Sequence, residues 1–268
     1  MAVPSQPGRS VTSKVLAILE AFEALGSTLT LTQIAEATSV PLSTTHRLVG
    51  EMVGWGALDR DEHGRYHVGL RLWEVAQSAG QQLHDAARPF LQDLFSLTQE
   101  TSHLAIREGY EALYIDRVYS SKRVPRASRV GGRLPLHATA VGKILLAYEE
   151  PWLRDAYVSR SLAAPTTRTH VNPTRLLQEL TAIREQGYAT TFEEVRAGSC
   201  SIAVPVLHEE GPAEAALGLV MLSTQATQLA RHLPALQSIA HRIEKAIARH
   251  PIGYLTASRD SSRRSSVL

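Results

Sequence analysis

The residues that could carry covalent chemistry are few. The single cysteine, Cys200, could act as a nucleophile, with His137 as its base and Glu193 or Glu194 as the carboxylate that orients the base. A lone cysteine in a strand is more often buried and inert, and two adjacent glutamates point to opposite faces of a strand. We therefore expect no enzyme, and keep a cysteine-dependent hydrolase with a helical accessory domain as the alternative.

Neither a metal nor a cofactor is expected. The chain has eleven histidines, but His63 and His67 are predicted to span a hairpin turn and a strand rather than one helical face, and the others do not gather at zinc-ligand spacing. A single cysteine excludes an intrachain disulfide and a multi-cysteine zinc cage. No glycine-rich loop has phosphate-binding spacing. The chemistry that remains is non-covalent recognition.

A stripe of small hydroxyl groups and one guanidinium indicates recognition of DNA. In a predicted helix over residues 42–53, such groups lie opposite the apolar side: Ser43, Thr44, Arg47 and, near the border, Thr45. Small hydroxyls allow close approach to phosphates and base edges, and a guanidinium can reach guanine or the backbone. On a helix that merely packs against the rest of the chain, the same stripe would be a solvated surface.

Two shorter elements precede this helix and position it. Apolar residues spaced three and four apart predict a helix over residues 10–25, and a second helix follows over residues 31–37 with Thr30 as its N-cap. Pro41 prevents the second helix from continuing into the third. Two short helices joined by a tight turn form a helix-turn-helix, whose second helix can enter the major groove.

A β-hairpin is predicted directly after the third helix, over residues 57–68. Its alternating pattern places Leu58, Tyr66 and Val68 inward, and the arginines of the hairpin can touch phosphate. A helix-turn-helix followed by such a hairpin is a winged helix. The complete set of expected DNA contacts is Lys14, Thr32, Gln33, Ser43, Thr44, Thr45, Arg47, Arg60 and Arg65.

The charge balance gives no support to broad electrostatic binding of nucleic acid. The formal net charge is +2, and residues 1–80 contain six Lys or Arg against eight Asp or Glu. DNA-binding domains are often basic. The phosphate contacts of this domain should therefore be few and local.

Four stretches, in the same order and spacing, resemble the IclR family of bacterial transcription regulators. They are VPLSTTHRL at residues 40–48, DEHGRYHVG at 61–69, GGRLPLHATAVGK at 131–143, and the run from Gly187 to Val206. The resemblance covers roughly residues 9–250. It implies a winged helix-turn-helix, a linker helix, and an effector-binding domain with a GAF-like fold, an antiparallel sheet flanked by helices. It also implies a homodimer or homotetramer bound to a palindromic operator in double-stranded DNA.

The resemblance further implies a pocket for a small-molecule effector. The corresponding residues of this chain are Leu134, Ala140, Val141, Phe192, Ser201, Met221 and Ser223, with Arg126 in the preceding loop as a candidate carboxylate partner. The helix that starts after Thr139 could hold an anion on its free backbone N–H groups. Phe192 stands where the family commonly has an acidic residue. We therefore expect a small organic acid that is aromatic or otherwise partly apolar.

The whole chain is predicted to be α+β, with an ordinary content of 44% apolar and 20% charged residues. We expect a DNA-binding domain over residues 9–69, a linker helix over 70–83, an effector-binding domain over 84–252 and a disordered tail over 253–268. Pro89 predicts a break in the helix after the linker. The lack of a signal peptide and of a run of about 18 apolar residues favours a cytoplasmic protein without a membrane partner. A metabolite-binding protein that regulates another protein, not DNA, is a further alternative.

Overall fold

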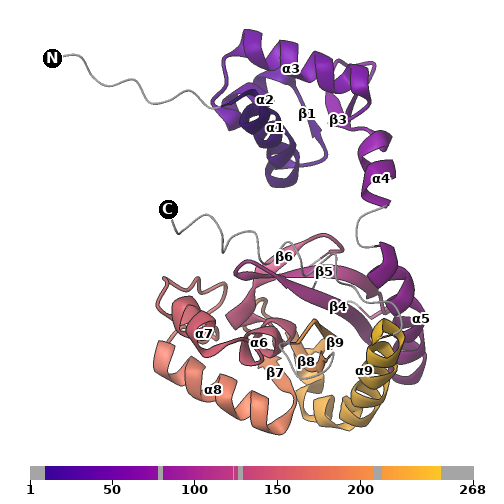
Figure 1. Cartoon of the computed structure of the whole chain (residues 1–268), viewed down its shortest axis with the longest axis vertical. Coiled ribbons are helices and arrows are strands. Elements are labelled where there is room, and N and C mark those ends of the chain that lie inside the picture. Colours follow the sequence, from indigo (N-terminus) through magenta and orange to yellow (C-terminus); the bar gives the residue numbers. More distant parts are fainter. Residues whose placement is uncertain (1–9, 78–80, 123, 126–128, 208–212, 249–268) are drawn as a thin grey trace, which may run out of the picture. The chain divides into compact units, whose positions relative to one another are not determined.

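The computed structural model describes residues 10–77, 81–122, 124–125, 129–207 and 213–248. The chain forms two compact units, residues 1–79 and residues 80–268 (Figure 1). The predicted disordered tail over 253–268 and the predicted effector contact of Arg126 lie outside the described residues. Within the described residues, no helix combines the length and the apolar character that crossing a bilayer requires.

Three helices make up most of the N-terminal unit: α1 (Val11–Leu25), α2 (Leu31–Thr38) and α3 (Leu42–Trp55). The hydroxyl of Ser10 accepts a hydrogen bond from the backbone N–H of Ser13 at 3.0 Å and caps α1. Thr30 caps α2, as predicted. Apolar residues from all three helices form one buried core together with residues of the following hairpin. The predicted helix-turn-helix is therefore confirmed.

A three-stranded antiparallel sheet completes this unit, in the order β1 (Thr28–Leu29), β3 (Tyr66–Val68) and β2 (Leu58–Arg60). The pairing of β2 with β3 is the predicted hairpin, and β1 is a strand too short to show a sequence pattern. Leu58 and Tyr66 are buried as predicted, but Val68 is 48% exposed. Val68 is the last residue of its strand, and the chain leaves the core there.

Two helices follow the hairpin, where the sequence predicts a linker helix over residues 70–83 and a second helix after it. They are α4 (Leu70–Gln77) and α5 (Gln81–Thr98). The predicted break at Pro89 is wrong, because α5 runs through this residue. Pro89 lies on the exposed side of α5, whereas Leu91 and Leu94 are fully buried. The packing of that buried side outweighs the cost of the missing backbone N–H.

The C-terminal unit is built on a six-stranded antiparallel sheet in the order β6-β5-β4-β9-β8-β7. Its strands are β4 (Thr101–Glu108), β5 (Glu111–Val118), β6 (Arg133–Pro135), β7 (Ala189–Phe192), β8 (Ser199–Val206) and β9 (Ala215–Leu222). The central contact, β4 with β9, joins segments that are about a hundred residues apart in the chain, with His103 opposite Gly218.

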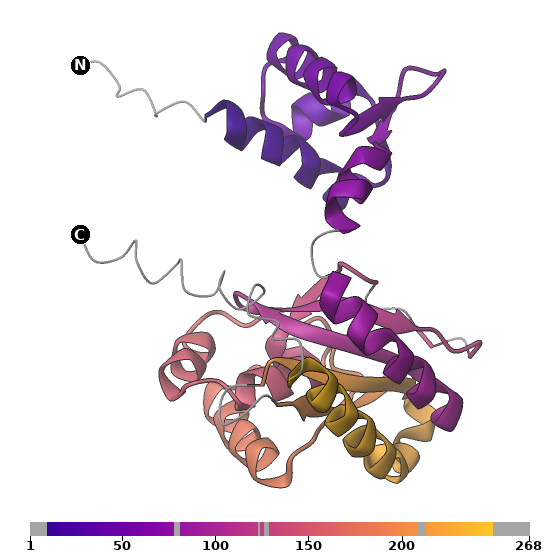
Figure 2. The same cartoon turned by 45° about the vertical axis from the view of Figure 1, so that its right-hand side comes forward.

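Helices cover both faces of this sheet (Figures 1 and 2). α5 packs beside α9 (Leu233–Ala248), and their apolar residues form one core with the facing strand residues. The other face carries the short turn η1 (Leu136–Ala138) and the helices α6 (Ala140–Ala147), α7 (Pro151–Val158) and α8 (Pro173–Gln186), with a second core. The ten-residue segment η2 (Ser223–His232) leads from β9 into α9. The predicted antiparallel sheet flanked by helices is confirmed.

Candidate functional site

The exposed side of α3 presents the polar groups that the sequence assigns to DNA recognition. Ser43 and Arg47 are exposed, and Thr44 is half-buried. The Nη1 atom of Arg47 lies 2.5 Å from Oε1 of Glu51, and both side chains remain more than half exposed, at 57% and 63%. The guanidinium is thus held on the outer surface of the helix by a neighbour one turn away.

Thr45 does not belong to this surface, so its assignment as a DNA contact is wrong. Its side chain is fully buried. Its hydroxyl donates to the backbone carbonyl oxygens of Val40 and Pro41, at 3.2 Å each. Successive residues of a helix are rotated by about 100°, and this rotation turns Thr45 from the exposed stripe into the core.

The other predicted DNA contacts of the N-terminal helices differ in their exposure and in whether they already form hydrogen bonds within the protein. Gln33 is used in the helix cap: its Oε1 accepts from the backbone N–H of Thr30 at 2.8 Å, and its own N–H donates to the Thr30 hydroxyl at 3.3 Å. Thr32 is exposed at the start of α2, and Lys14 is half-buried on α1. DNA contact by these residues stays a prediction.

Both arginines of the wing are exposed. Nε of Arg65 lies 3.0 Å from Oδ2 of Asp61, and Oδ1 of the same carboxylate accepts the backbone N–H groups of His63 and Arg65 in the hairpin turn. The guanidinium of Arg60 lies 5.5 Å from the centre of the Tyr66 ring. Asp61 therefore shapes the turn and neutralises part of the positive charge of the wing, in keeping with few phosphate contacts.

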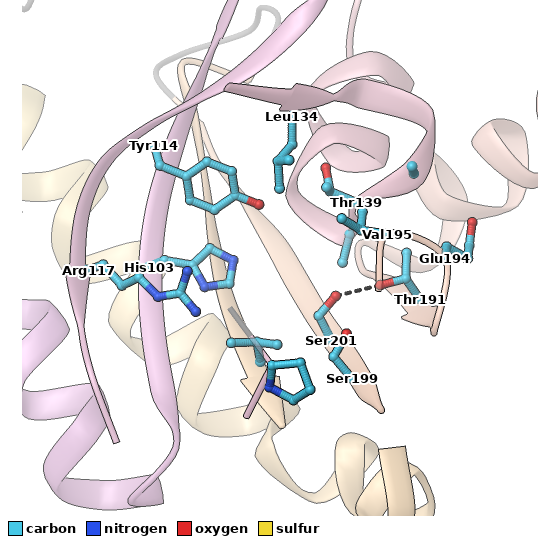
Figure 3. Close-up of a pocket in the computed structure, with 14 residues that line it drawn as sticks. His103, Tyr114, Arg117, Leu134, Thr139, Thr191, Glu194, Val195, Ser199 and Ser201 are labelled. Atoms are coloured by element: carbon cyan, nitrogen blue, oxygen red, sulfur yellow. Dashed lines mark hydrogen bonds between the residues drawn. The ribbon is translucent and has the colours of Figure 1, made fainter. Parts of the chain in front are cut away.

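The C-terminal unit contains a partly open pocket between the sheet and the start of α6, with a cavity volume of about 40 Å³ (Figure 3). Side chains from β4 and β5 lie on one side of it, and Thr139, Thr191 and Ser201 lie on the other. Its polar lining includes His103, Tyr114, Arg117, Thr139, Thr191 and Ser201. The hydroxyls of Thr191 and Ser201 are hydrogen-bonded at 2.5 Å.

Three of the predicted effector-binding residues, Leu134, Ala140 and Ser201, line this pocket. Val141 is fully buried in α6 and packs in the adjoining core. Ser223 lies at the start of η2, where its backbone N–H donates to the carbonyl of Gly198 at 3.0 Å. Neither Val141 nor Ser223 is among the lining residues.

Phe192 lines a second pocket, which shares Thr191 and Glu194 with the first, and neither Phe192 nor Met221 lines the pocket at the start of α6. The residues that line it are their immediate neighbours, Thr191 and Val220. Met221 packs in the core beneath α5 and α9, and Phe192 is 38% exposed, under the guanidinium of Arg168. Because successive strand residues face opposite sides, a one-residue error in alignment moves a side chain to the other face. Phe192 therefore does not make the pocket more apolar.

The sequence reading missed the polar side of the pocket formed by β4 and β5. His103 and Arg117 are buried, but β4 reads TSHLAIRE and β5 reads EALYIDRV, so other polar residues surround both and no local pattern singles them out. Burial and the nearby charge of Arg117 lower the pKa of His103 to about 3, so its imidazole is neutral at physiological pH. Its ring lies 5.2 Å from the ring of Tyr114.

A buried lysine connects the pocket to α8. Nζ of Lys143 lies 2.6 Å from Oε1 of Glu179 and 2.8 Å from Oε1 of Glu194, which lines the pocket. Burial raises the pKa of Glu194, and the charge of Lys143 opposes this shift. His170, Glu179 and Glu194 offer ligand atoms within 4.8 Å of one another, a spacing that a metal ion could accept. The single positive charge of the Lys143 ammonium group already compensates part of the negative charge of the two carboxylates.

The groups proposed for covalent catalysis lie on opposite faces of the sheet. Cys200 packs in the core beneath α5 and α9, where its thiol donates to the carbonyl of Leu222 at 3.3 Å. His137 lies on the other face, with Nδ1 2.8 Å from the Tyr157 hydroxyl and Nε2 2.8 Å from the carbonyl of Ala163. A nucleophile and its base must be within hydrogen-bonding reach. The alternative of a hydrolase built on Cys200 and His137 is therefore wrong.

We expect the thiol of Cys200 to be unreactive in the native protein. Burial raises its pKa from 9.0 to about 11, so the thiolate fraction at neutral pH falls about a hundredfold. Mass spectrometry after treatment with iodoacetamide should show slow alkylation in buffer and fast alkylation in denaturant. Equal rates in the two conditions would contradict the burial of this side chain.

Comparison with known proteins links both units to one family. The model of the IclR helix-turn-helix domain matches residues 11–62, and that of the bacterial transcriptional regulator IclR C-terminal domain matches residues 76–245. The Escherichia coli regulator XynR is 32% identical over 87% of this chain and 95% of its own length. The E. coli repressor AllR is 31% identical over 84% of each chain.

Solved structures agree with these matches. An IclR homologue from Microbacterium hydrocarbonoxydans, in complex with 4-hydroxybenzoate, superposes with a TM-score of 0.83 at 32% identity, covering 90% of this chain and 99% of that one. The Thermotoga maritima IclR protein gives a TM-score of 0.73 at 26% identity over 88% of this chain and 98% of its own. With a winged helix-turn-helix and a pocketed sheet domain in one chain, the protein belongs to the IclR family of DNA-binding transcription regulators.

Proposed function

We propose that the pocket of the C-terminal unit binds an aromatic monocarboxylic acid and that its occupancy changes the affinity of the winged helix for operator DNA. The observation that carries this proposal is the composition of the pocket. Apolar Leu134 and Val220 and the ring of Tyr114 supply surface for an aromatic ring, and the start of α6 borders the same space. The complex of the Microbacterium hydrocarbonoxydans homologue with 4-hydroxybenzoate supports this class of ligand.

The start of α6 is the candidate site for the carboxylate. The first backbone N–H groups of a helix have no acceptor within the helix, and the N-terminal end of the helix dipole favours an anion. Thr139 accepts from the N–H of Gly142 at 3.0 Å, which uses one of these donors. Ala140, the first residue of the helix, is almost completely buried and lines the pocket. A bound carboxylate would give its buried N–H an acceptor.

The proposed DNA complex contains two copies of the winged helix. A palindromic operator in double-stranded DNA requires two recognition helices at a matching spacing, and a homodimer or homotetramer supplies them. Ser43, Thr44 and Arg47 would face the major groove, and Arg60 and Arg65 would contact phosphates beside it. A change in the relative placement of two winged helices would alter operator affinity. Such a regulator acts on the chromosome, in the cytoplasm.

Isothermal titration calorimetry tests the ligand class. We expect the dissociation constant of 4-hydroxybenzoate to be at least about tenfold lower than that of glyoxylate, because burial of the ring adds a favourable apolar contribution that glyoxylate lacks. A gel shift with the DNA upstream of the protein's own gene should then change when 4-hydroxybenzoate is added. Tight binding of glyoxylate without binding of any aromatic acid would contradict the proposal.

A further inference from the structure

The imidazole of His103 borders the pocket and has one ring nitrogen, Nδ1, that the described part of the fold does not use. The residue is only 4% exposed, lines the pocket, and comes from the middle of the sheet. Within the part of the chain that the structure describes, its Nδ1 atom has no hydrogen-bond partner. A buried polar atom without a partner destabilises the protein unless a bound molecule supplies one.

The surroundings hold this ring in place. It is tilted against the ring of Tyr114, with the ring centres 5.2 Å apart. Below it, a side-chain carbon on Gly218 would come within 2.7 Å of Nε2 of His103 and 2.9 Å of Cγ1 of Val141. The glycine therefore leaves the space that the imidazole occupies between the sheet and α6. A group fixed in this way is preorganised to contact a ligand.

The charge state of His103 selects the kind of ligand group that it can bind. Burial and the charge of Arg117 lower its pKa to about 3. A neutral imidazole has one donor and one acceptor nitrogen, so it can pair with a neutral hydroxyl whichever tautomer is present. In Figure 3, His103 lies on the side of the pocket with Tyr114 and Arg117, while Thr139, at the start of α6, lies on the other side. A ligand with its carboxylate at α6 can therefore present a second polar group to His103.

We propose that His103 recognises a ring hydroxyl of the effector, so that the protein selects hydroxylated aromatic acids over aromatic acids that lack this group. This assignment rests on the proposed function, since it requires an aromatic acid in the pocket. His103 is then a specificity-determining residue. Its hydrogen bond adds discrimination because an analogue without the hydroxyl leaves the buried imidazole unpaired.

The test compares 4-hydroxybenzoate with 4-methylbenzoate, whose methyl group has a similar size and forms no hydrogen bond. Calorimetry on the full chain should give a dissociation constant at least about tenfold lower for the hydroxylated acid. In His103→Phe, which keeps an aromatic ring beside Tyr114, this ratio should fall to about one while binding of 4-methylbenzoate persists. A persisting affinity for 4-methylbenzoate also shows that the variant pocket is folded.

A second measurement uses the unaltered protein. In nitrogen-15 spectra of the histidine-labelled chain, the imidazole signal of His103 should shift when 4-hydroxybenzoate is added, and much less with 4-methylbenzoate. The His103→Phe variant identifies the signal by its absence. Equal shifts with the two acids would overturn the assignment.

The remaining outcomes separate this assignment from the proposed function. Equal affinities of the wild-type protein for the two acids would overturn the role of His103 alone. An equal loss of affinity for both acids in His103→Phe, with the ratio kept, would place the imidazole at the carboxylate and also overturn it. Loss of the ratio in Tyr114→Phe but not in His103→Phe would assign the hydroxyl to the tyrosine instead. Failure of all aromatic acids to bind would overturn the proposed function and this assignment together.

Discussion

Replacing Arg47 by alanine is expected to weaken operator binding by about 5- to 150-fold, which corresponds to the roughly 1–3 kcal/mol of a good arginine–base contact. Arg47 lies on the exposed side of α3, where its side chain is 57% exposed. Effector affinity should not change, because the effector pocket lies in the C-terminal unit. Fluorescence anisotropy with labelled operator DNA measures the first quantity, and calorimetry measures the second.

Glu51→Ala is the matched control for this variant. Glu51 forms the ion pair with Arg47 and would bring a negative charge towards the phosphates. Its removal frees the guanidinium and should leave operator affinity unchanged or increase it. If Arg47→Ala bound the operator as tightly as the parent protein, the assignment of α3 as the recognition helix would lose its main support.

The Lys143→Met substitution is expected to lower the free energy of unfolding by about 3–5 kcal/mol, the usual cost of removing one partner from a buried ion pair. The Lys143 side chain is completely buried between Glu179 and Glu194. Without the ammonium, Glu194 would be left as a buried carboxylate that has lost its ion-pair partner. Chemical denaturation of the full chain, followed by circular dichroism, measures the loss.

Arg133→Met provides the comparison on the surface. Arg133 pairs with Glu108 at 2.6 Å, but the two side chains are 41% and 50% exposed. Exposed pairs contribute about 0–1 kcal/mol, so this variant should stay within about 1 kcal/mol of the parent. Similar losses of unfolding free energy for Lys143→Met and Arg133→Met would show that burial does not determine how much Lys143 contributes to stability.

The pH dependence of Lys143→Met follows from the same pair. Burial already raises the pKa of Glu194, and loss of the ammonium removes the charge that opposes this shift. A carboxyl whose folded pKa is raised above its unfolded value destabilises the protein at higher pH, and this cost disappears as pH falls through the folded pKa. The stability deficit should therefore be smaller near about pH 5 than near about pH 8. Adding Glu194→Gln should recover part of it at neutral pH.

Local patterns in the sequence were sufficient to predict the helix-turn-helix and the hairpin. Helical spacing of apolar residues identified α1 and α3, and the N-cap Thr30 of α2 is the one predicted. These features depend on residues within one or two turns of each other, so they can be read along the chain. The error at Pro89 has the opposite cause: a local helix-breaking signal is overridden by packing against distant elements.

The pocket could be predicted only in part. The stretch around Leu134 and Ala140 is continuous in the chain, and both residues do line it. Phe192 and Met221 were misplaced because a strand has a period of two, and one residue decides which face a side chain occupies. The structure resolves this through the pairing of β7 with β8 and of β8 with β9.

The sequence by itself thus determined the helices and the hairpin of the N-terminal unit, and which family's architecture the chain builds. Only the tertiary structure decided which polar groups meet. His103 enters the pocket because β4 pairs with β9, and Lys143 finds Glu179 and Glu194 at separations of 36 and 51 residues. Local elements follow from short-range sterics and hydrogen bonds. Contacts between residues far apart in the chain follow instead from the register of distant strands and from the packing of helices on the sheet. No local pattern of residues carries that information.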